Sequence, residues 1–125
     1  MNNQINRIII ILLAMLVVSC SKPLDIQLEP EVHMFISNDS EKKIRLTQED
    51  EAYVFLNTWL HENKANWFPT SGRYPDGVYI KSGAYGIQIT ELKVIIYTTL
   101  GSEPQAIYIQ DINKGELNKI VDVEK

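Results

Sequence analysis

The residues that could carry covalent, acid–base or metal chemistry are few and widely spaced in this chain of 125 residues. Its two histidines, His33 and His61, are far apart, and no histidine or cysteine stands at the short spacings typical of metal sites. No serine lies in the G-x-S-x-G pattern of a nucleophile elbow, and the sequence has no glycine-rich phosphate loop. We therefore expect no catalytic residue, metal or cofactor, and we expect that the protein is not an enzyme.

The single cysteine, Cys20, directly follows an apolar segment near the N-terminus. Residues 8–18 read IIIILLAMLVV, with Arg7 before them and Ser19 after them. A helix that spans a bilayer needs about 20 apolar residues, so this shorter run is typical of an export signal. Exported proteins seldom leave one thiol unpaired, so Cys20 needs an explanation of its own.

The segment from Val17 to Cys20 provides that explanation. It reads VVSC and resembles the lipobox of bacterial lipoproteins, in which a small residue precedes a cysteine that is acylated and becomes the new first residue. Several acyl chains at one point anchor a protein stably. Ser21 follows where an aspartate would imply retention in the inner membrane, so the resemblance implies an outer-membrane anchor that faces the periplasm. We therefore expect lipidation of Cys20.

These features divide the chain into a lipoprotein signal peptide (1–19), a lipid anchor and tether (20–30) and one globular domain (31–125). The tether contains two prolines and no sustained periodicity, which predicts a linking segment of about ten residues that reaches at most roughly 30 Å. Removal of the signal peptide takes away one basic residue, Arg7, of 12, and none of the 16 acidic residues, which leaves a formal net charge of −5. An acidic chain without a basic stripe is a poor candidate for binding nucleic acid. We expect a protein partner, with a basic toxin or enzyme as the favoured class.

The domain shows strand patterns on both sides of one amphipathic helix. Alternating residues predict an N-terminal hairpin from 31–37 and 43–46, and Thr47 is the expected N-cap of a helix over 48–63. A four-strand meander follows, with a turn at Ser82-Gly83, and a short helix closes the chain. The predicted meander strands are Val78–Lys81, Ala84–Thr90, Leu92–Leu100 and Gln105–Gln110, and the closing helix is Asn113–Val121. The expected fold class is α+β: an N-terminal β-hairpin, one amphipathic helix packed on a four-strand antiparallel meander, and a short C-terminal helix.

The loop between the helix and the meander carries the residue types best suited to binding. It begins with Trp67 and Phe68 and continues through Arg73, Tyr74 and Asp76 within a segment rich in proline and glycine. Trp, Tyr and Arg dominate binding hot spots because they combine a large contact area with a polar tip. We predict a partner-binding site at these five residues. In the alternative, Trp67 and Phe68 fold back over the sheet as a lid on the core.

A second candidate surface is the sheet face that the helix leaves uncovered. Alternation along the strands places Tyr79, Lys81, Lys93 and Tyr97 on this face, and Tyr108 is a further candidate. An exposed face of aromatic and lysine side chains is a plausible docking surface.

The helix and the following loop, from LNTWLHENKANW to YGIQI, resemble a group of small Gram-negative lipoproteins of unassigned role. The resemblance covers Leu46 to Ile89, and proteins of this build resemble immunity factors against periplasmic toxins. It implies a lipid-anchored periplasmic binding protein that neutralises a toxin or hydrolase by occlusion. A related alternative is inhibition of lysozyme, because Ser82 to Tyr85 is similar to the Ser-Gly loop of lipoprotein lysozyme inhibitors. The other alternative is a structural accessory lipoprotein of an envelope or secretion complex, whose sheet edge would pair with a partner strand.

Overall fold

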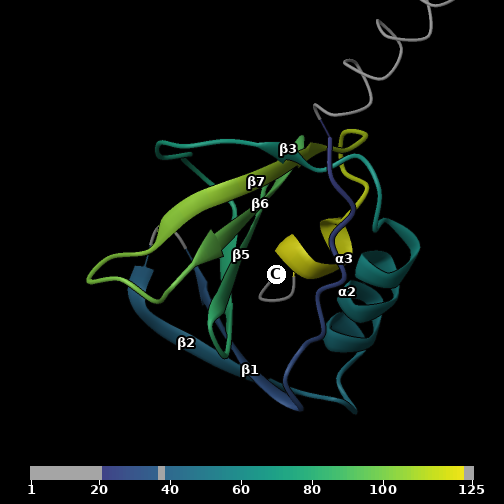
Figure 1. Cartoon of the computed structure of the whole chain (residues 1–125). Helices are drawn as coiled ribbons and strands as arrows, with labels where there is room; N and C mark the ends of the chain where they lie inside the picture. Colours follow the sequence, from purple (N-terminus) through teal and green to yellow (C-terminus); the bar gives the residue numbers. More distant parts are fainter. Residues whose placement is uncertain (1–20, 37–38, 123–125) are drawn as a thin grey trace, which may run out of the picture.

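The computed structural model describes residues 21–36 and 39–122. The predicted signal peptide and Cys20 lie outside these described residues. The described chain forms seven strands and two helices, and Figure 1 shows how they are arranged. In chain order they are β1 (Glu31–Ile36), β2 (Asp39–Thr47), α2 (Glu51–Glu62), β3 (Phe68–Pro69), β4 (Val78–Ser82), β5 (Tyr85–Ile89), β6 (Lys93–Thr98), β7 (Gln105–Asp111) and α3 (Asn118–Val121).

All the strands join one antiparallel sheet in the order β2-β1-β4-β5-β6-β7-β3. The expected fold class is therefore wrong, because the protein is mostly a seven-strand sheet with two short helices rather than an α+β fold built on a four-strand meander. Pairing of Met34 in β1 with Ile80 in β4 joins the N-terminal hairpin to the meander. At the other edge, Phe68 in β3 pairs with Ile109 in β7. Both pairings join strands that are far apart in the sequence, so no local sequence pattern predicts them.

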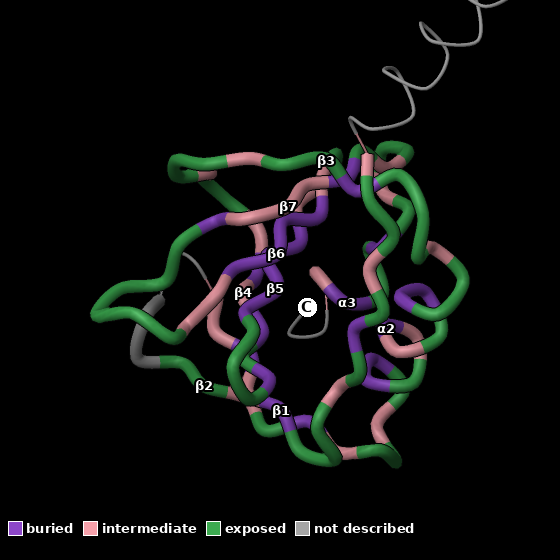
Figure 2. The backbone as a smooth tube through the Cα atoms, viewed as in Figure 1, coloured by how far each residue is buried: buried purple, intermediate pink, exposed green. Residues whose placement is uncertain are grey.

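The main core lies between one sheet face and the two helices (Figures 1 and 2). Strands such as β1, β4 and β5 send alternate residues into this core, as the two-residue period of a strand requires. The buried residues from the strands and α2 are Val32, Met34, Leu46, Ala52, Tyr53, Leu56, Trp59, Leu60, Val78, Ile80, Ile87, Ile89, Val94 and Ile96. All the buried residues of α2 belong to the predicted apolar face.

Both helices are shorter than the sequence predicts. The N-cap of α2 is Asp50 rather than Thr47. The Asp50 carboxylate turns back and accepts a hydrogen bond of 2.7 Å from the backbone N–H of Thr47, so it makes no capping bond to the helix. Asn63, an expected C-terminal residue, donates its side-chain amide to the carbonyl of Trp59 at 2.8 Å. The closing helix is reduced to α3 because turns occupy the residues before it.

The segment from 21 to 30 is packed against the domain, so the prediction of a tether that precedes the domain is wrong for this part of the chain. It runs alongside α2 (Figure 1), and Ile26 is buried in the main core. The Tyr53 hydroxyl on α2 donates to the carbonyl of Glu29 at 2.8 Å, and the N–H of Glu29 donates to the Ser82 hydroxyl at 2.8 Å. Apolar burial and these hydrogen bonds hold the segment against the domain. The lack of periodicity in its sequence indicates only that the segment is neither an amphipathic helix nor an alternating strand.

Candidate functional site

The two histidines lie on different elements of the structure. On β1, the His33 Nε2 is 3.4 Å from the Glu31 carboxylate, whereas His61 is exposed in the last turn of α2. Within residues 21–36 and 39–122, no three His, Cys, Asp or Glu side chains are grouped to hold a metal ion. The same residues include no helix with the length and apolar character needed to cross a membrane. The feature best suited to function is the sheet face opposite the helices.

Residues 70–77, which we call the strap, cross that face from β3 at the sheet edge to β4 in its interior (Figure 1). Tyr74, in the middle of the strap, packs on a small second core of Ile95, Tyr97 and Ala106. We call the strap together with the sheet face beneath it the strap face. The strap is the part of the chain that contains most of the predicted binding residues.

A buried glutamine on β5 holds the strap against the sheet. The Gln88 side-chain amide donates hydrogen bonds of 2.8 Å to the backbone carbonyls of Tyr74 and Asp76. Its side-chain oxygen accepts a hydrogen bond of 2.5 Å from the hydroxyl of Tyr97 on β6. Gln88 is only 7% exposed, so these bonds form away from water and satisfy groups that would otherwise be buried unpaired. The strap is therefore fixed at its centre.

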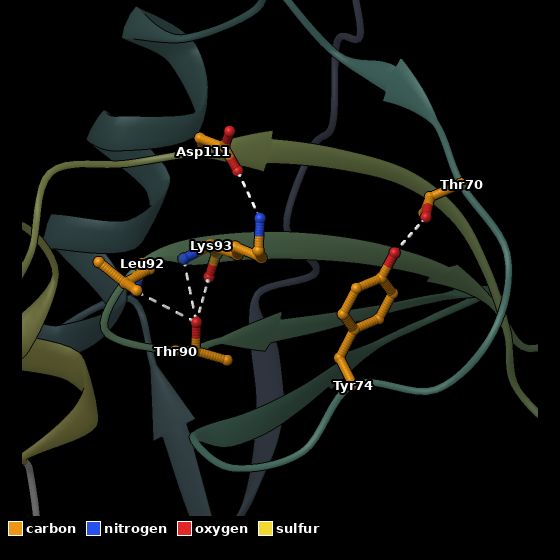
Figure 3. Close-up of polar contacts among 6 residues, drawn as sticks. All are labelled: Thr70, Tyr74, Thr90, Leu92, Lys93 and Asp111. Carbon is orange, nitrogen blue, oxygen red and sulfur yellow. Dashed lines mark hydrogen bonds and ion pairs between the residues drawn. The ribbon is translucent and has the colours of Figure 1, made fainter.

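The beginning of the strap is fixed as well. The Thr70 N–H donates to the carbonyl of Ile107 on β7 at 3.0 Å. The Thr70 and Tyr74 hydroxyls form a hydrogen bond across the turn of the strap, and Figure 3 shows the Tyr74 ring directed toward Thr70. Bonds at both positions reduce the conformational freedom that a loop would otherwise lose on binding.

The five predicted binding residues are divided between the core and the surface. Phe68 is 47% exposed on β3, and Tyr74 is half-buried in the strap. Arg73 is exposed, with its guanidinium 3.6 Å from the Glu103 carboxylate. Asp76 is exposed and has a positive φ of 72°, and its carbonyl accepts the bond from Gln88. These four residues lie on or beside the strap face.

Trp67 is not a surface residue, so its prediction as a binding residue is wrong. Its side chain is 1% exposed and meets Trp59 edge to face, with 6.0 Å between the ring centroids. The indole N–H donates to the carbonyl of Asn63 at 2.9 Å, which satisfies its only polar group inside the core. The alternative prediction of a core lid is confirmed for Trp67 but not for Phe68, because Trp67 precedes β3 and is buried, whereas Phe68 in β3 is exposed.

Tyrosines form the centre of the strap face. The Tyr79 and Tyr97 rings pack edge to face at 5.6 Å between centroids, and Gly86 on β5 leaves room for the Tyr79 ring. A Cβ atom at Gly86 would lie 1.9 Å from the Tyr79 hydroxyl oxygen. That hydroxyl is buried, and among the described residues it has no hydrogen-bond partner.

Burial raises the pKa of Tyr79. The pKa of Tyr97 is also raised, mainly by burial and to a smaller extent by the nearby phenols of Tyr79 and Tyr74. Both phenols are therefore neutral at physiological pH, and they contribute contact area and hydrogen bonding rather than charge.

Depressions interrupt the strap face at several points. The largest, about 560 Å³, lies where Phe35, Tyr79 and Lys81 meet the turn between β6 and β7. Two others, of about 460 and 440 Å³, share Tyr74 and Lys93 in their walls. Figure 3 shows Lys93 extending toward Asp111, and their charged groups are 2.8 Å apart. These volumes fall in the range of small-molecule pockets, and they also suit side chains of a protein partner.

The predicted uncovered face is largely correct. Tyr79, Lys81, Lys93 and Tyr97 all lie on the strap face, as their register shows. Tyr108 does not, because the irregular pairing between β6 and β7 places it opposite Ile96 and against the main core.

The sequence interpretation missed Gln88 and Phe35. The available signal for Gln88 was its position between Ile87 and Ile89, since a polar residue inside an apolar central strand needs buried partners. For Phe35, the alternation of residues along β1 indicates the face on which its side chain lies. Only the β1–β4 pairing places it beside Tyr79, with 6.5 Å between the ring centroids.

Comparisons with protein-family models, with curated proteins and with solved structures gave no match for this chain.

Proposed function

We propose that this chain is a lipid-anchored envelope protein that binds a protein partner through the strap face and neutralises it by occlusion. The partner is a toxin or hydrolase of the periplasm, and the anchor is the acylated Cys20 of the outer membrane. The proposal rests on the VVSC sequence for the anchor and on the strap for binding.

One observation carries the binding proposal: a loop rich in hot-spot residue types is pinned to the sheet by buried hydrogen bonds. Gln88 bonds two backbone carbonyls of the strap, which holds the half-buried Tyr74 near the exposed Phe68 and leaves Arg73 exposed beside Glu103. A prearranged surface of this composition loses little entropy on binding, so more of the contact energy appears as affinity. Occlusion needs only such a surface and no reacting group.

The net charge supports a basic partner. The mature chain carries 16 acidic and 11 basic residues after the signal peptide with Arg7 is removed. At the strap face itself the charges are mixed, because Lys93 pairs with Asp111 and Arg73 lies near Glu103. The acidic surplus would therefore act over distance to accelerate encounter with a basic protein, while the strap supplies contact affinity.

A photo-cross-linking amino acid placed at Arg73 tests the proposal in intact cells. We expect cross-linking to a periplasmic hydrolytic protein, and we expect the same substitution at Thr58, exposed on the outer side of α2, to give none. The purified partner should lose its hydrolytic activity when it is mixed with an equal amount of this protein.

Affinity measurements then identify the contact residues. The double change Phe68→Ala and Arg73→Ala should weaken binding of the partner at least tenfold, about 1.4 kcal/mol, and the control Thr58→Ala should not. Unchanged affinity with the fold intact would exclude the strap as the contact. Cross-linking only from Arg45, on the edge strand β2, would instead favour the accessory-subunit alternative, in which a partner strand adds to the sheet.

The lysozyme-inhibitor alternative has less support in the local geometry. Ser82, the serine of the proposed inhibitory loop, is 3% exposed, and its hydroxyl accepts the hydrogen bond from the N–H of Glu29. A side chain committed to an internal bond is a poor candidate for insertion into another protein's active site.

A further inference from the structure

The domain begins immediately after the predicted lipid attachment site. Lys22 and Trp67 form an antiparallel bridge, in which the Lys22 N–H donates to the Trp67 carbonyl at 2.8 Å and the Trp67 N–H donates to the Lys22 carbonyl at 3.2 Å. The next contact follows at once, because the Leu24 N–H donates to the Lys64 carbonyl at 2.7 Å. Only Ser21 stands between the first bonded residue and Cys20.

This arrangement sets a short limit on the distance between anchor and domain. The Cα atoms of Cys20 and Lys22 are separated by two residue steps, which span at most about 7 Å. A ten-residue tether would instead have allowed about 30 Å. If Cys20 carries the acyl chains, the loop that joins α2 to β3 must therefore lie at the level of the lipid headgroups.

We propose that residues 64–66, together with Lys22, form a membrane-contacting surface that seats the domain directly on the phospholipid leaflet holding its anchor. This inference rests on the lipidation of Cys20 in the proposed function. It goes beyond the anchor because it predicts the orientation of the domain, with one end held against the bilayer.

The residues at this end suit lipid headgroups. Lys22, Lys64 and Asn66 are exposed. Among the described residues, no carboxylate forms an ion pair with Lys22, whereas Lys64 lies 3.4 Å from Asp25. Lysines attract anionic phospholipids. The partner of this surface is thus a phospholipid leaflet, not a second protein.

The segment from Lys22 to Glu29 also identifies the end of the domain that lies opposite the membrane. From Lys22 the chain runs alongside the 12-residue helix α2, which is about 18 Å long, to Glu29 (Figure 1). There the Glu29 N–H bonds Ser82, next to the turn at Gly83 and Ala84. This turn should therefore face the periplasm, away from the membrane.

Two exposed alanines provide a matched test, because Ala65 lies at the proposed membrane end and Ala84 at the far end. With Cys20 acylated, Ala65→Cys and Ala84→Cys each introduce the only free thiol of the mature chain. Each full acylated protein is labelled with the same fluorophore and inserted into phosphatidylethanolamine–phosphatidylglycerol vesicles that contain a lipid with a nitroxide headgroup. We expect at least threefold stronger quenching at position 65 than at position 84.

A linker provides the control for reach. Ten Gly/Ser residues inserted between Ser21 and Lys22 should bring the two quenching values close to equality, and a ratio that the insertion leaves unchanged would overturn the argument from chain length. Equal quenching at the two positions without the insertion, in protein that incorporates labelled palmitate, would overturn the seating and leave the lipid anchor standing. Absence of palmitate incorporation would overturn both.

Discussion

Replacement of Gln88 by leucine tests whether buried hydrogen bonds hold the strap on the sheet. Leucine is similar in size to glutamine but can neither donate nor accept a hydrogen bond. The change removes two bonds of 2.8 Å to the carbonyls of Tyr74 and Asp76, and one bond of 2.5 Å from the Tyr97 hydroxyl. It leaves the Tyr97 hydroxyl without the partner that it has in the native structure.

The size of the effect follows from the number of bonds. A neutral hydrogen bond contributes about 1 kcal/mol net, so the loss of three should lower the free energy of unfolding by about 3 kcal/mol. Apolar contacts of the new leucine with the cluster around Ile95 would offset part of this loss. For a domain of this size, such a change lowers Tm by on the order of 15 °C.

Gln110 provides the control, because it is a second glutamine of nearly equal exposure, 8% against 7% for Gln88. Its side chain donates one bond, of 2.6 Å, to the carbonyl of Ala65. Gln110→Leu should therefore cost about 1 kcal/mol, a third of the expected cost at Gln88. Adding Tyr97→Phe to Gln88→Leu should be less costly than Tyr97→Phe alone, since it removes a hydroxyl that has already lost its partner.

Urea unfolding followed by tryptophan fluorescence measures these free energies, and amide hydrogen exchange locates the change. Exchange should accelerate across the strap in Gln88→Leu and remain slow there in Gln110→Leu. Equal destabilisation by the two leucine variants, or unchanged exchange in the strap of Gln88→Leu, would refute the role assigned to Gln88.

Three further outcomes follow from burial. Trp67→Ala should lower the free energy of unfolding, measured in urea, by about 4 kcal/mol. Phe68→Ala, a change at the exposed neighbouring residue, should lower it by less than about 1 kcal/mol. Similar costs for the two variants would contradict the assignment of Trp67 to the core. Burial raises the pKa of Tyr79 and Tyr97, so both phenols stabilise the folded state fully below the ordinary tyrosine pKa near 10, and this stabilisation is lost at higher pH. Tyr97→Phe should therefore make the decline in stability at alkaline pH shallower. Gly86→Ala should destabilise the protein by about 2 kcal/mol because its Cβ would meet the Tyr79 ring, and Tyr79→Ala in the same chain should remove most of that cost.

Local patterns alone predicted several elements of this protein. Apolar periodicity indicated the helix whose buried residues include Leu56 and Leu60, and it indicated the strands of the meander. The hairpin between β4 and β5 is confirmed, but its two-residue turn is Gly83-Ala84 rather than Ser82-Gly83, because Ser82 pairs with Tyr85. These features depend on backbone preferences and side-chain spacing within about ten residues, which the sequence displays directly. The lipidation of Cys20 stays a prediction.

Other features were decided by contacts between distant parts of the chain. The β1–β4 pairing, the position of Trp67 in the core and the docking of residues 21–30 all required surfaces that exist only after the sheet has formed. The candidate site shows the same division: the sequence indicated a loop of binding residue types, but the bonds of Gln88 determined which side of that loop faces outward. A residue's own sequence neighbours set its local conformation, whereas its burial depends on which distant segments pack against it, and this chain has no local pattern that specifies those pairings.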